Sequence, residues 1–447
     1  MLHFGFTVAD MSTVTHAETG PGNGGGRPAG RIISGPLALV FLSEFCVLSS
    51  FFLLLSVMPM LAAAAGVGSS GAGFMTGSLL LGTVAAEAAA AAAIRRFGGR
   101  MVLAAGAVLL GAPALAMLAR QPQAVMVSVS LVRGFGFGLC GVVTGALTAQ
   151  LLPPGRRGEG LGLLGVVSGV PAVVALPAGV WLAGHHLGAA AAAMAATAGL
   201  LPLVVIRWLP GGREERRTAR ARRMPGGRGE RRTARTRRTP GGREQSRTAR
   251  ASRMPGARRS GRIPGALRSG RMAAAALRLP LIFAAATIAA GVLDSFLPLA
   301  KGVPSSLASA ALLVQAITAT LSRWQAGKRG DRYGHARLLV PALGVAALGM
   351  AAMLGLGSPV VIFAGMVLFG AGFGVIENAT FALLIEQQPE DKASALWNLA
   401  YDAGYGAGPA VFGLFCARTG YPAAFALTGA LILAAVPAAL REKKAVA

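Results

Sequence analysis

The chain has 447 residues, of which 54% are apolar and 13% are charged, and its mean hydropathy is +0.59. A soluble domain usually carries about a quarter charged residues, so this composition excludes an ordinary water-soluble globular protein. The net charge of +26 is concentrated in one place, because 21 arginines and only 4 acidic residues lie between Pro210 and Met272.

The apolar residues form long blocks that recur along the chain. A helix needs about 20 mostly apolar residues to cross roughly 30 Å of hydrocarbon, and in lipid only helices or closed barrels satisfy their backbone polar groups. No alternating strand pattern is present, so the blocks are predicted to be transmembrane helices. After an N-terminal segment 1–34 that is expected to be disordered, six helices are predicted at 36–61, 71–94, 101–119, 124–152, 159–183 and 187–208. Six more are predicted at 274–300, 305–324, 338–356, 359–386, 393–416 and 421–440.

These blocks form two related halves. When the chain is shifted by 236 residues, helices two to six overlay helices eight to twelve, so that Gly134 meets Gly370 and Gly138 meets Gly374. Parallel six-helix repeats with a substrate site between them are one known architecture of secondary transporters. The sequence therefore predicts an all-α, polytopic membrane protein with two pseudo-symmetric six-helix bundles, 35–208 and 273–440.

The segment that joins the halves, 209–272, has a shorter repeat. Pro-Gly pairs begin at Pro210, Pro225, Pro240 and Pro255, which is a period of fifteen residues. The segment has too few apolar residues to form a core and is predicted to be a disordered linker. A more specific hypothesis is that its arginines, within 210–271, contact anionic lipid headgroups. No nucleic-acid partner is expected, because no aromatic residues interleave the arginines for base stacking.

Charge in the loops predicts the orientation in the membrane. With twelve spans both termini lie on one side, and positively charged loops favour the cytoplasm. The arginine-rich loops, which include the Arg323–Arg337 loop and the tail 441–447, all fall on the side of the termini, whereas the opposite loops hold only Arg120, Lys301 and Arg418. A multi-pass protein of the cell membrane with both termini in the cytoplasm is therefore expected.

The loop between the second and third helices of the second half reads GKRGDRYGHAR. It resembles the loop signature of the major facilitator superfamily at Gly327, Asp331, Arg332, Gly334 and Arg337. The resemblance implies a secondary transporter in which Asp331 latches the cytoplasmic side by engaging a neighbouring helix end. Asp331 is also expected to lie near a helix N-terminus and to gain from its dipole. The alternative is a charged turn that only fixes orientation.

Glycine and proline motifs extend the resemblance. The fourth helix carries an arginine followed by spaced glycines, and the fifth and eleventh helices resemble the Gly-Pro motif associated with proton-coupled antiporters. These residues are Gly134, Gly136, Gly138, Pro177, Gly179, Gly404, Gly408 and Pro409. Small residues at such spacings let helices approach closely, so a packing role is the simpler interpretation.

Charged residues inside the predicted spans are the candidates for coupling. A charge in hydrocarbon costs at least ~2.5 kcal/mol, so each needs a partner or a wet cavity. The candidates are Glu44, Arg133, Asp294, Glu377 and Asp402; Glu87 is expected near the cytoplasmic boundary. The first, fourth, seventh and tenth helices, which line the cavity in the resembled family, hold the first four of them. The hypothesis is that Glu44, Asp294 and Glu377 bind protons or substrate and that Arg133 pairs with one of them. Structural ion pairs are the alternative.

No phosphate-binding loop, nucleophile motif or metal-ligand cluster occurs in the sequence, so neither an enzyme nor a cofactor is predicted. The predicted function is alternating-access transport, with proton-coupled efflux of small hydrophobic or amphiphilic compounds as the leading interpretation. Proton-coupled uptake of a polar metabolite is the first alternative. A transport-inactive membrane scaffold or sensor is the second.

Overall fold

The computed structural model describes residues 34–151, 157–209 and 277–446. Within these ranges every regular element is helical and no strand occurs. The predicted N-terminal segment 1–34 and the predicted linker 209–272 fall outside the described residues, apart from Ser34 and Leu209.

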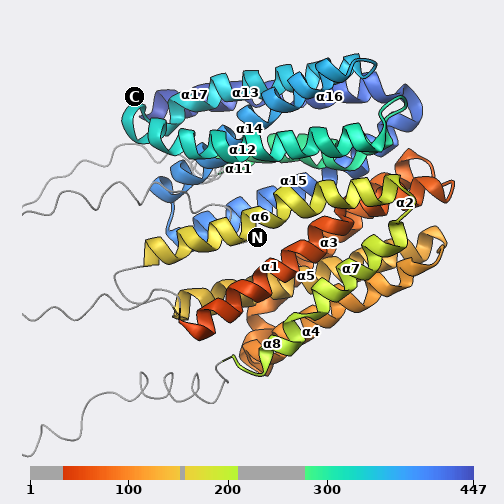
Figure 1. Ribbon diagram of the computed structural model, residues 1–447. Helices are drawn as coiled ribbons and strands as arrows, with labels where there is room; N and C mark the ends of the chain where they lie inside the picture. The colour runs from red at the N-terminus through yellow and green to blue at the C-terminus, as the bar shows by residue number, and fades with distance from the viewer. Residues whose placement is uncertain (1–33, 152–156, 210–276, 447) are drawn as a thin grey trace, which may run out of the picture. The chain divides into compact units, whose positions relative to one another are not determined.

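The first half of the chain forms the helices α1 to α8, and the second half forms the helices α11 to α17 (Figure 1). The first half contains α1 (Gly35–Leu55), α2 (Val57–Ala64), α3 (Ser69–Phe97), α4 (Gly99–Gly111), the 3-10 helix η2 (Ala112–Leu118), α5 (Gln123–Leu151), α6 (Arg157–Gly184), α7 (Gly188–Leu200) and α8 (Pro202–Ile206). The second half contains α11 (Arg278–Phe296), η3 (Leu297–Leu299), α12 (Ser305–Tyr333), α13 (His335–Ala352), η4 (Met353–Gly355), α14 (Pro359–Gln387), α15 (Glu390–Thr419), α16 (Tyr421–Ala434) and α17 (Val436–Val446).

Most of these helices are long and apolar enough to cross a membrane. Eleven spans in the described residues meet both conditions, counting consecutive helices such as α1 and α2 as one. The twelfth helix, α15, has 30 residues but is less apolar, because Asn398, Asp402 and several glycines occupy its middle. The predicted all-α, twelve-helix membrane fold is confirmed.

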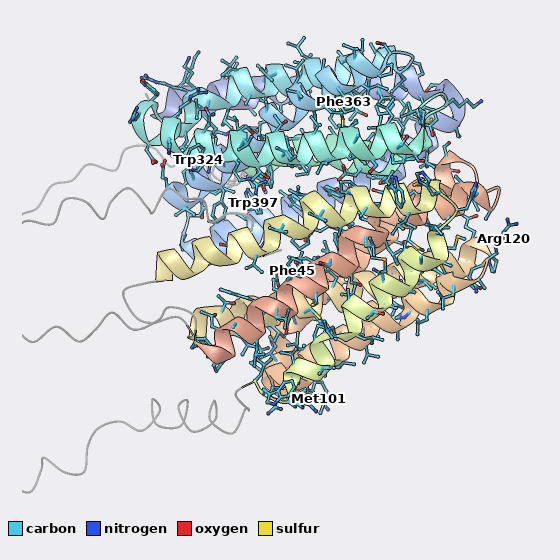
Figure 2. All side chains as sticks on the ribbon, viewed as in Figure 1. Phe45, Met101, Arg120, Trp324, Phe363 and Trp397 are labelled. Atoms are coloured by element: carbon cyan, nitrogen blue, oxygen red, sulfur yellow. The ribbon has the colours of Figure 1, made fainter. Side chains whose placement is uncertain are left out.

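Apolar side chains also cover the outside of the bundle, as Figure 2 shows. Met101 and Leu81 are about two-thirds exposed, at 64% and 65%, and Phe45 and Trp324 are also exposed. Outward-facing apolar residues in this number are expected where the surrounding medium is hydrocarbon rather than water.

The helix α12 is longer than the sequence predicts. The expected end was residue 324, but α12 continues to Tyr333 and stops at Gly334, whose φ of 86° is one that glycine adopts readily. Asp331 therefore lies in the last turn of α12 and is exposed, rather than lying at a helix N-terminus. The predicted favourable dipole interaction is wrong for this reason, since a helix C-terminus favours cations. Among the described residues, no ion pair or hydrogen bond joins Asp331 to a neighbouring helix end.

The C-terminus also differs from prediction, because the expected tail 441–447 is helical up to Val446 as part of α17. Glu442 is buried there and forms an ion pair with Arg278 at 3.0 Å. The last helix is thus attached to the first helix of the second half.

The closest helix packing is repeated in the two halves at one offset. In the first half, Gly134 of α5 packs directly on the main chain of Leu79 in α3. In the second half, 236 residues later, Gly370 of α14 packs on the main chain of Gln315 in α12. The next turn repeats the contact, with Gly138 on Thr83 and Gly374 on Ala319. A side chain at these glycines would hold the backbones apart, which explains why both halves need glycine there.

The hydrogen bonds between the halves gather at one end of the bundle. We call the end where α1 begins and α17 ends the terminus side, and the opposite end the distal side. Among the described residues, four hydrogen bonds join the halves in the distal part of their helices. They run from Ser56 to the main-chain oxygen of Asp294 (2.5 Å), from Ser69 to that of Gly413 (3.0 Å), from Ser309 to that of Pro177 (2.7 Å) and between the hydroxyls of Thr76 and Ser295 (2.9 Å). These contacts close the distal side with hydroxyl and backbone groups.

Candidate functional site

Glu44 lies inside the first half and is held by a hydroxyl group. It projects from α1 with 1% of its surface exposed, and the Thr144 hydroxyl of α5 donates to its Oε2 at 2.5 Å. The same hydroxyl lies 3.0 Å from the carbonyl oxygen of Cys140, one turn earlier. Because a hydroxyl both donates and accepts, Thr144 can donate to an ionised Glu44, or accept from a protonated one while donating to Cys140. This pair accommodates both protonation states.

Arg133 of α5 is equally buried but is not beside a carboxylate. Its Nη2 donates to the carbonyl oxygen of Ser50 in α1 at 2.8 Å, and its Nη1 has no hydrogen-bond acceptor among the described residues. No described Asp or Glu forms an ion pair with it, so the expected pairing with a coupling carboxylate is not what the structure has. Arg133 instead ties α5 to α1 through the backbone.

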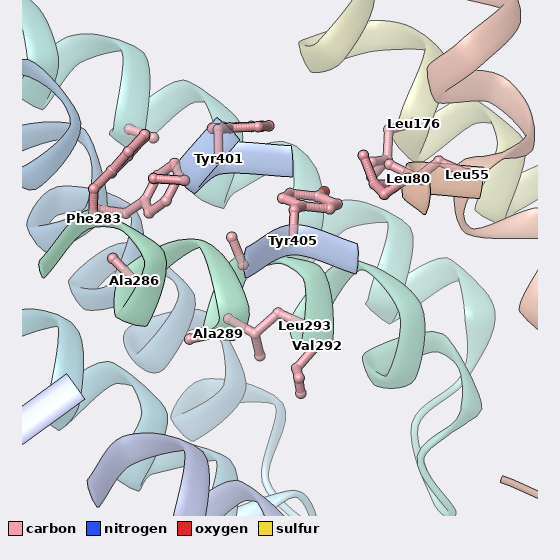
Figure 3. Close-up of a cluster of buried hydrophobic side chains, with 14 of the residues drawn as sticks. Leu55, Leu80, Leu176, Phe283, Ala286, Ala289, Val292, Leu293, Tyr401 and Tyr405 are labelled. Carbon is pink, nitrogen blue, oxygen red and sulfur yellow. The ribbon is translucent and has the colours of Figure 1, made fainter. Parts of the chain in front are cut away.

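Asp294 is a buried carboxylate of the second half that, like Glu44, is held by a hydroxyl group. It lies near the end of α11, and the hydroxyl of Tyr405 in α15 donates to its carboxylate. The Tyr405 ring stacks on the Tyr401 ring, with the ring centroids 5.4 Å apart and the planes at 17°. Figure 3 shows the two side chains next to each other. The Tyr401 ring centroid in turn lies 5.8 Å from that of Trp397. The three aromatic rings are therefore stacked along one face of α15, and this stack positions the Tyr405 hydroxyl.

Glu377 is held by Arg323, a cation that the sequence predicts in a cytoplasmic loop. It lies in α14 with 1% exposure and forms an ion pair with Arg323 of α12, whose side chain is 18% exposed. The expectation that Arg323 belongs to the loop is wrong, because α12 continues to Tyr333, nine residues beyond the predicted helix end at residue 324. Glu377 is thus neutralised by a neighbour within its own half.

Asp402 faces the other half of the protein. It lies in the middle of α15 with none of its surface exposed, and its charged neighbour is Glu87 of α3. When both groups are ionised, neither oxygen of Asp402 receives a hydrogen bond from the described residues. Two facing carboxyls can share a proton or a cation, which makes this pair chemically different from the other three carboxylates.

The second half collects its carboxyls around one side chain. Glu377, Asp294 and Asp402 are all close enough to Tyr401 to act on it electrostatically, and so is Arg323. The structure therefore brings three of the four predicted acidic residues into one neighbourhood. Glu44 and Arg133 belong to the other half, where they contact α5 and α1.

The glycine and proline motifs are helix contacts, as the simpler interpretation predicts. The main chain of a neighbouring helix lies against each of these glycines: Gly134 and Gly138 contact α3, Gly136 contacts α4, Gly179 contacts α1, and Gly404 and Gly408 contact α11. Pro409 of α15 lies against Gly73 of α3, so part of the Gly-Pro motif sits at the contact between the halves. Pro177 offers its carbonyl oxygen to Ser309, also across that contact.

Sequence reasoning missed several partners of the charged residues, namely Thr144, Arg323, Tyr401 and Tyr405. One signal was available: Trp397, Tyr401 and Tyr405 recur every four residues, which places them on one helix face. No set of three or more His, Cys, Asp or Glu residues in the described part of the chain could hold a metal ion.

Comparisons with known proteins agree with this architecture. The family model of the Major Facilitator Superfamily matches residues 40–394 and 281–446. Among solved structures, the fold is similar to the xylose transporter XylE from E. coli in a partially occluded inward-open conformation (15% identity, TM-score 0.65, covering 92% of this chain and 96% of that one). It is also similar to the nucleoside transporter NupG (12% identity, TM-score 0.63, covering 91% and 98%) and to a D-xylose-proton symporter (16% identity, TM-score 0.65, covering 90% and 95%).

At these identities the solved structures establish the fold alone. No protein with a curated description matches the sequence. The family model, however, matches most of the chain, including both halves that carry the buried charges. The chain therefore belongs to the Major Facilitator Superfamily, a family of membrane transporters.

Proposed function

We propose that the protein is a proton-coupled secondary transporter that exports small hydrophobic or amphiphilic compounds by alternating access. The observation that carries the proposal is the pair of buried carboxyls held by hydroxyls, Glu44 with Thr144 and Asp294 with Tyr405. A carboxyl in this setting can gain or lose a proton without leaving a cation unpaired, which is the property that a proton carrier needs.

Glu377 has a different role in this scheme. Because Arg323 already neutralises it, a substrate that bears positive charge competes with the arginine for the carboxylate. Glu377 is accordingly proposed as a substrate group, with Glu44 and Asp294 as the proton groups. The Gly-Pro motifs of α6 and α15 support export as the direction.

Proton-coupled uptake of a polar metabolite is the second candidate. Three amide side chains, Gln315, Asn378 and Asn398, are buried in the second half, where a polar molecule would need hydrogen-bonding groups. Solved structures with the same fold include a D-xylose-proton symporter, which favours uptake.

Orientation and location belong to the same proposal. The terminus side is proposed to face the cytoplasm of a cell membrane, because the basic loops gather there. The linker 209–272 would then lie in the cytoplasm, where its arginines can contact anionic lipid.

Everted vesicles that contain a pH-sensitive dye test the proposal. An exporter should release protons from acidified vesicles when the substrate is added, whereas an importer needs the substrate on the opposite face. Asp294→Asn and Glu44→Gln should each abolish this response. Glu386→Gln is the matched control, because Glu386 is an exposed carboxylate outside the proposed site. Undiminished proton-driven transport in Asp294→Asn and Glu44→Gln would refute the assignment.

A separate variant tests the scaffold alternative. Deletion of residues 210–271 should leave transport intact, since the proposed proton and substrate groups all lie in α1, α11 and α14. If the deletion variant is inserted in the membrane but inactive, the linker is part of the function and the transport proposal is incomplete.

A further inference from the structure

A groove runs along the contact between the two halves, on the side of α3 and α15. Its volume is about 600 Å³. Its walls are apolar and come from both halves: Phe74 and Leu81 of α3 on one side, and Ala403, Gly406 and Ala407 of α15 on the other. We call it the lateral groove.

The lateral groove exists because small residues line its floor. Gly406 packs against the Leu80 side chain, and Ala403 and Ala407 carry only a methyl group, so the helices touch while the space above them stays empty. Phe74 and Leu81 at its margin are 41% and 65% exposed. Because both helices span the membrane, these exposed apolar margins open the groove toward hydrocarbon rather than water.

One end of the groove is acidic. Asp402 contributes to its lining although none of the Asp402 surface is exposed, and Glu87 lies next to Asp402 across the contact between the halves. When both carboxyls are ionised, the described residues donate no hydrogen bond to the Asp402 carboxylate. An apolar groove with Asp402 in its lining and Glu87 beside Asp402 is complementary to a molecule with an apolar body and a positive charge.

We propose that the lateral groove binds a lipophilic organic cation taken from the hydrocarbon of the bilayer, with the cationic centre at Asp402 and Glu87 and the apolar body along α3 and α15. A neutral acyl chain fits the walls but makes no charge contact with the carboxyls. An anion of the same size fits the walls and is repelled by the carboxyls. This inference goes beyond the proposed transport function, because it assigns a binding site outside the Glu44, Asp294 and Glu377 groups and does not require transport.

Equilibrium binding of radiolabelled tetraphenylphosphonium tests the inference. The full-length protein is placed in nanodiscs of phosphatidylcholine, a zwitterionic lipid, and binding to empty nanodiscs is subtracted. We expect saturable binding of one cation per protein. Tetraphenylborate, which has the same size and the opposite charge, should not compete. Equal competition by the anion would refute the role of the carboxyls.

Three variants locate the bound cation. Asp402→Asn should weaken binding roughly tenfold or more, because a desolvated charge contact is lost. Ala407→Trp should weaken binding by filling the groove without touching either carboxyl. Leu414→Trp is the matched control on the same helix, outside the groove, and should bind as the unmodified protein does.

The outcomes separate this inference from the proposed function. If Ala407→Trp binds the cation normally, the lateral groove is not its site, whatever occupies the groove. If Glu44→Gln or Asp294→Asn abolishes binding and Ala407→Trp does not, the cation binds between the other carboxyls and the inference is wrong. If binding follows the expected pattern but no vesicle assay detects transport, the groove assignment stands and the transport proposal fails.

Discussion

The ion pair of Glu377 and Arg323 allows a quantitative test of how this fold stabilises a charge inside the membrane. Glu377 is 1% exposed, and only its Oε2 has a hydrogen-bond donor among the described residues, which is Arg323. Removing one member of a buried pair costs about 3–5 kcal/mol, because the other charge remains buried without compensation. Arg323→Met should therefore destabilise the protein strongly.

The effect of Arg323→Met has a ceiling that depends on pH. In the folded variant, Glu377 can take up a proton instead of remaining charged without a partner. Glutamate in the unfolded chain has a pKa of about 4.3, so this protonation costs about 1.4 kcal/mol for each pH unit above about 4.3. The destabilisation cannot exceed that cost. The ceiling is thus about 5 kcal/mol at pH 8 and about 1 kcal/mol at pH 5. The destabilisation should shrink as the pH falls, since protonation of Glu377 then replaces the lost arginine.

The partner variant should behave differently. Glu377→Gln leaves Arg323 charged, but the Arg323 side chain is 18% exposed and can reach polar surroundings, so a cost of about 1–2 kcal/mol with little pH dependence is expected. The double variant should be more stable than Arg323→Met alone at pH 8, which corresponds to a coupling energy of about 2 kcal/mol.

Unfolding in mixed detergent micelles, followed by tryptophan fluorescence at pH 5 and pH 8, measures all four proteins. The reasoning is refuted if Arg323→Met is no less stable than Glu377→Gln at pH 8. It is also refuted if the destabilisation by Arg323→Met is the same at both pH values.

Three other predictions concern packing, coupling and access. Gly134→Leu should prevent stable folding, because the new side chain would overlap the main chain of Leu79. Gly344→Leu should fold, since no atom lies within 4 Å of the Cβ position there. Elution from a sizing column in detergent distinguishes the two variants. Tyr405→Phe should keep the ring stack and the thermal stability but lower the proton flux in vesicles, because Asp294 loses its hydroxyl partner; an unchanged flux would contradict its role. The three cysteines are buried, so a maleimide should label none of them in the folded protein and all of them in sodium dodecyl sulfate. Mass spectrometry measures the labelling. Labelling of the native protein would contradict the burial of these cysteines.

Much of the fold could be predicted because it depends on features that lie in the sequence itself. Blocks of apolar residues predict the spans, and the offset of 236 residues pairs them into halves. The contacts of Gly134 with Leu79 and of Gly370 with Gln315 lie at that same offset, so the repeat in sequence is a repeat in backbone contact. Helix ends were less predictable, because apolarity marks where a helix meets the headgroups and not where it stops. The segment that follows Arg323 has no proline, and α12 continues through Gly327 and Gly330 before it ends at Gly334.

The site was harder to predict than the fold for the same reason. The acidic residues stand out in an apolar sequence, but their partners do not. Arg323 resembles a loop arginine, and Thr144 and Tyr405 resemble ordinary residues of a membrane helix. Which hydroxyl reaches which carboxyl depends on how α1 and α5, or α11 and α15, are rotated about their axes. That rotation is set by helix packing at glycines such as Gly404. A single sequence shows where these glycines are but not the distances between the helices that they allow.

The hydroxyl contacts that close the distal side have a consequence for the equilibrium between the closed and open states of that side. Four hydrogen bonds at about 1 kcal/mol each contribute roughly 4 kcal/mol to that closure. A ligand shifts a two-state equilibrium from 1:99 to 99:1 with about 5.5 kcal/mol of differential affinity. These four hydrogen bonds are therefore weak enough for a single bound small molecule to overcome. Because three of their four acceptors are main-chain oxygens, those three hydrogen bonds depend on the positions of the helix backbones and not on the side chains of the acceptor residues.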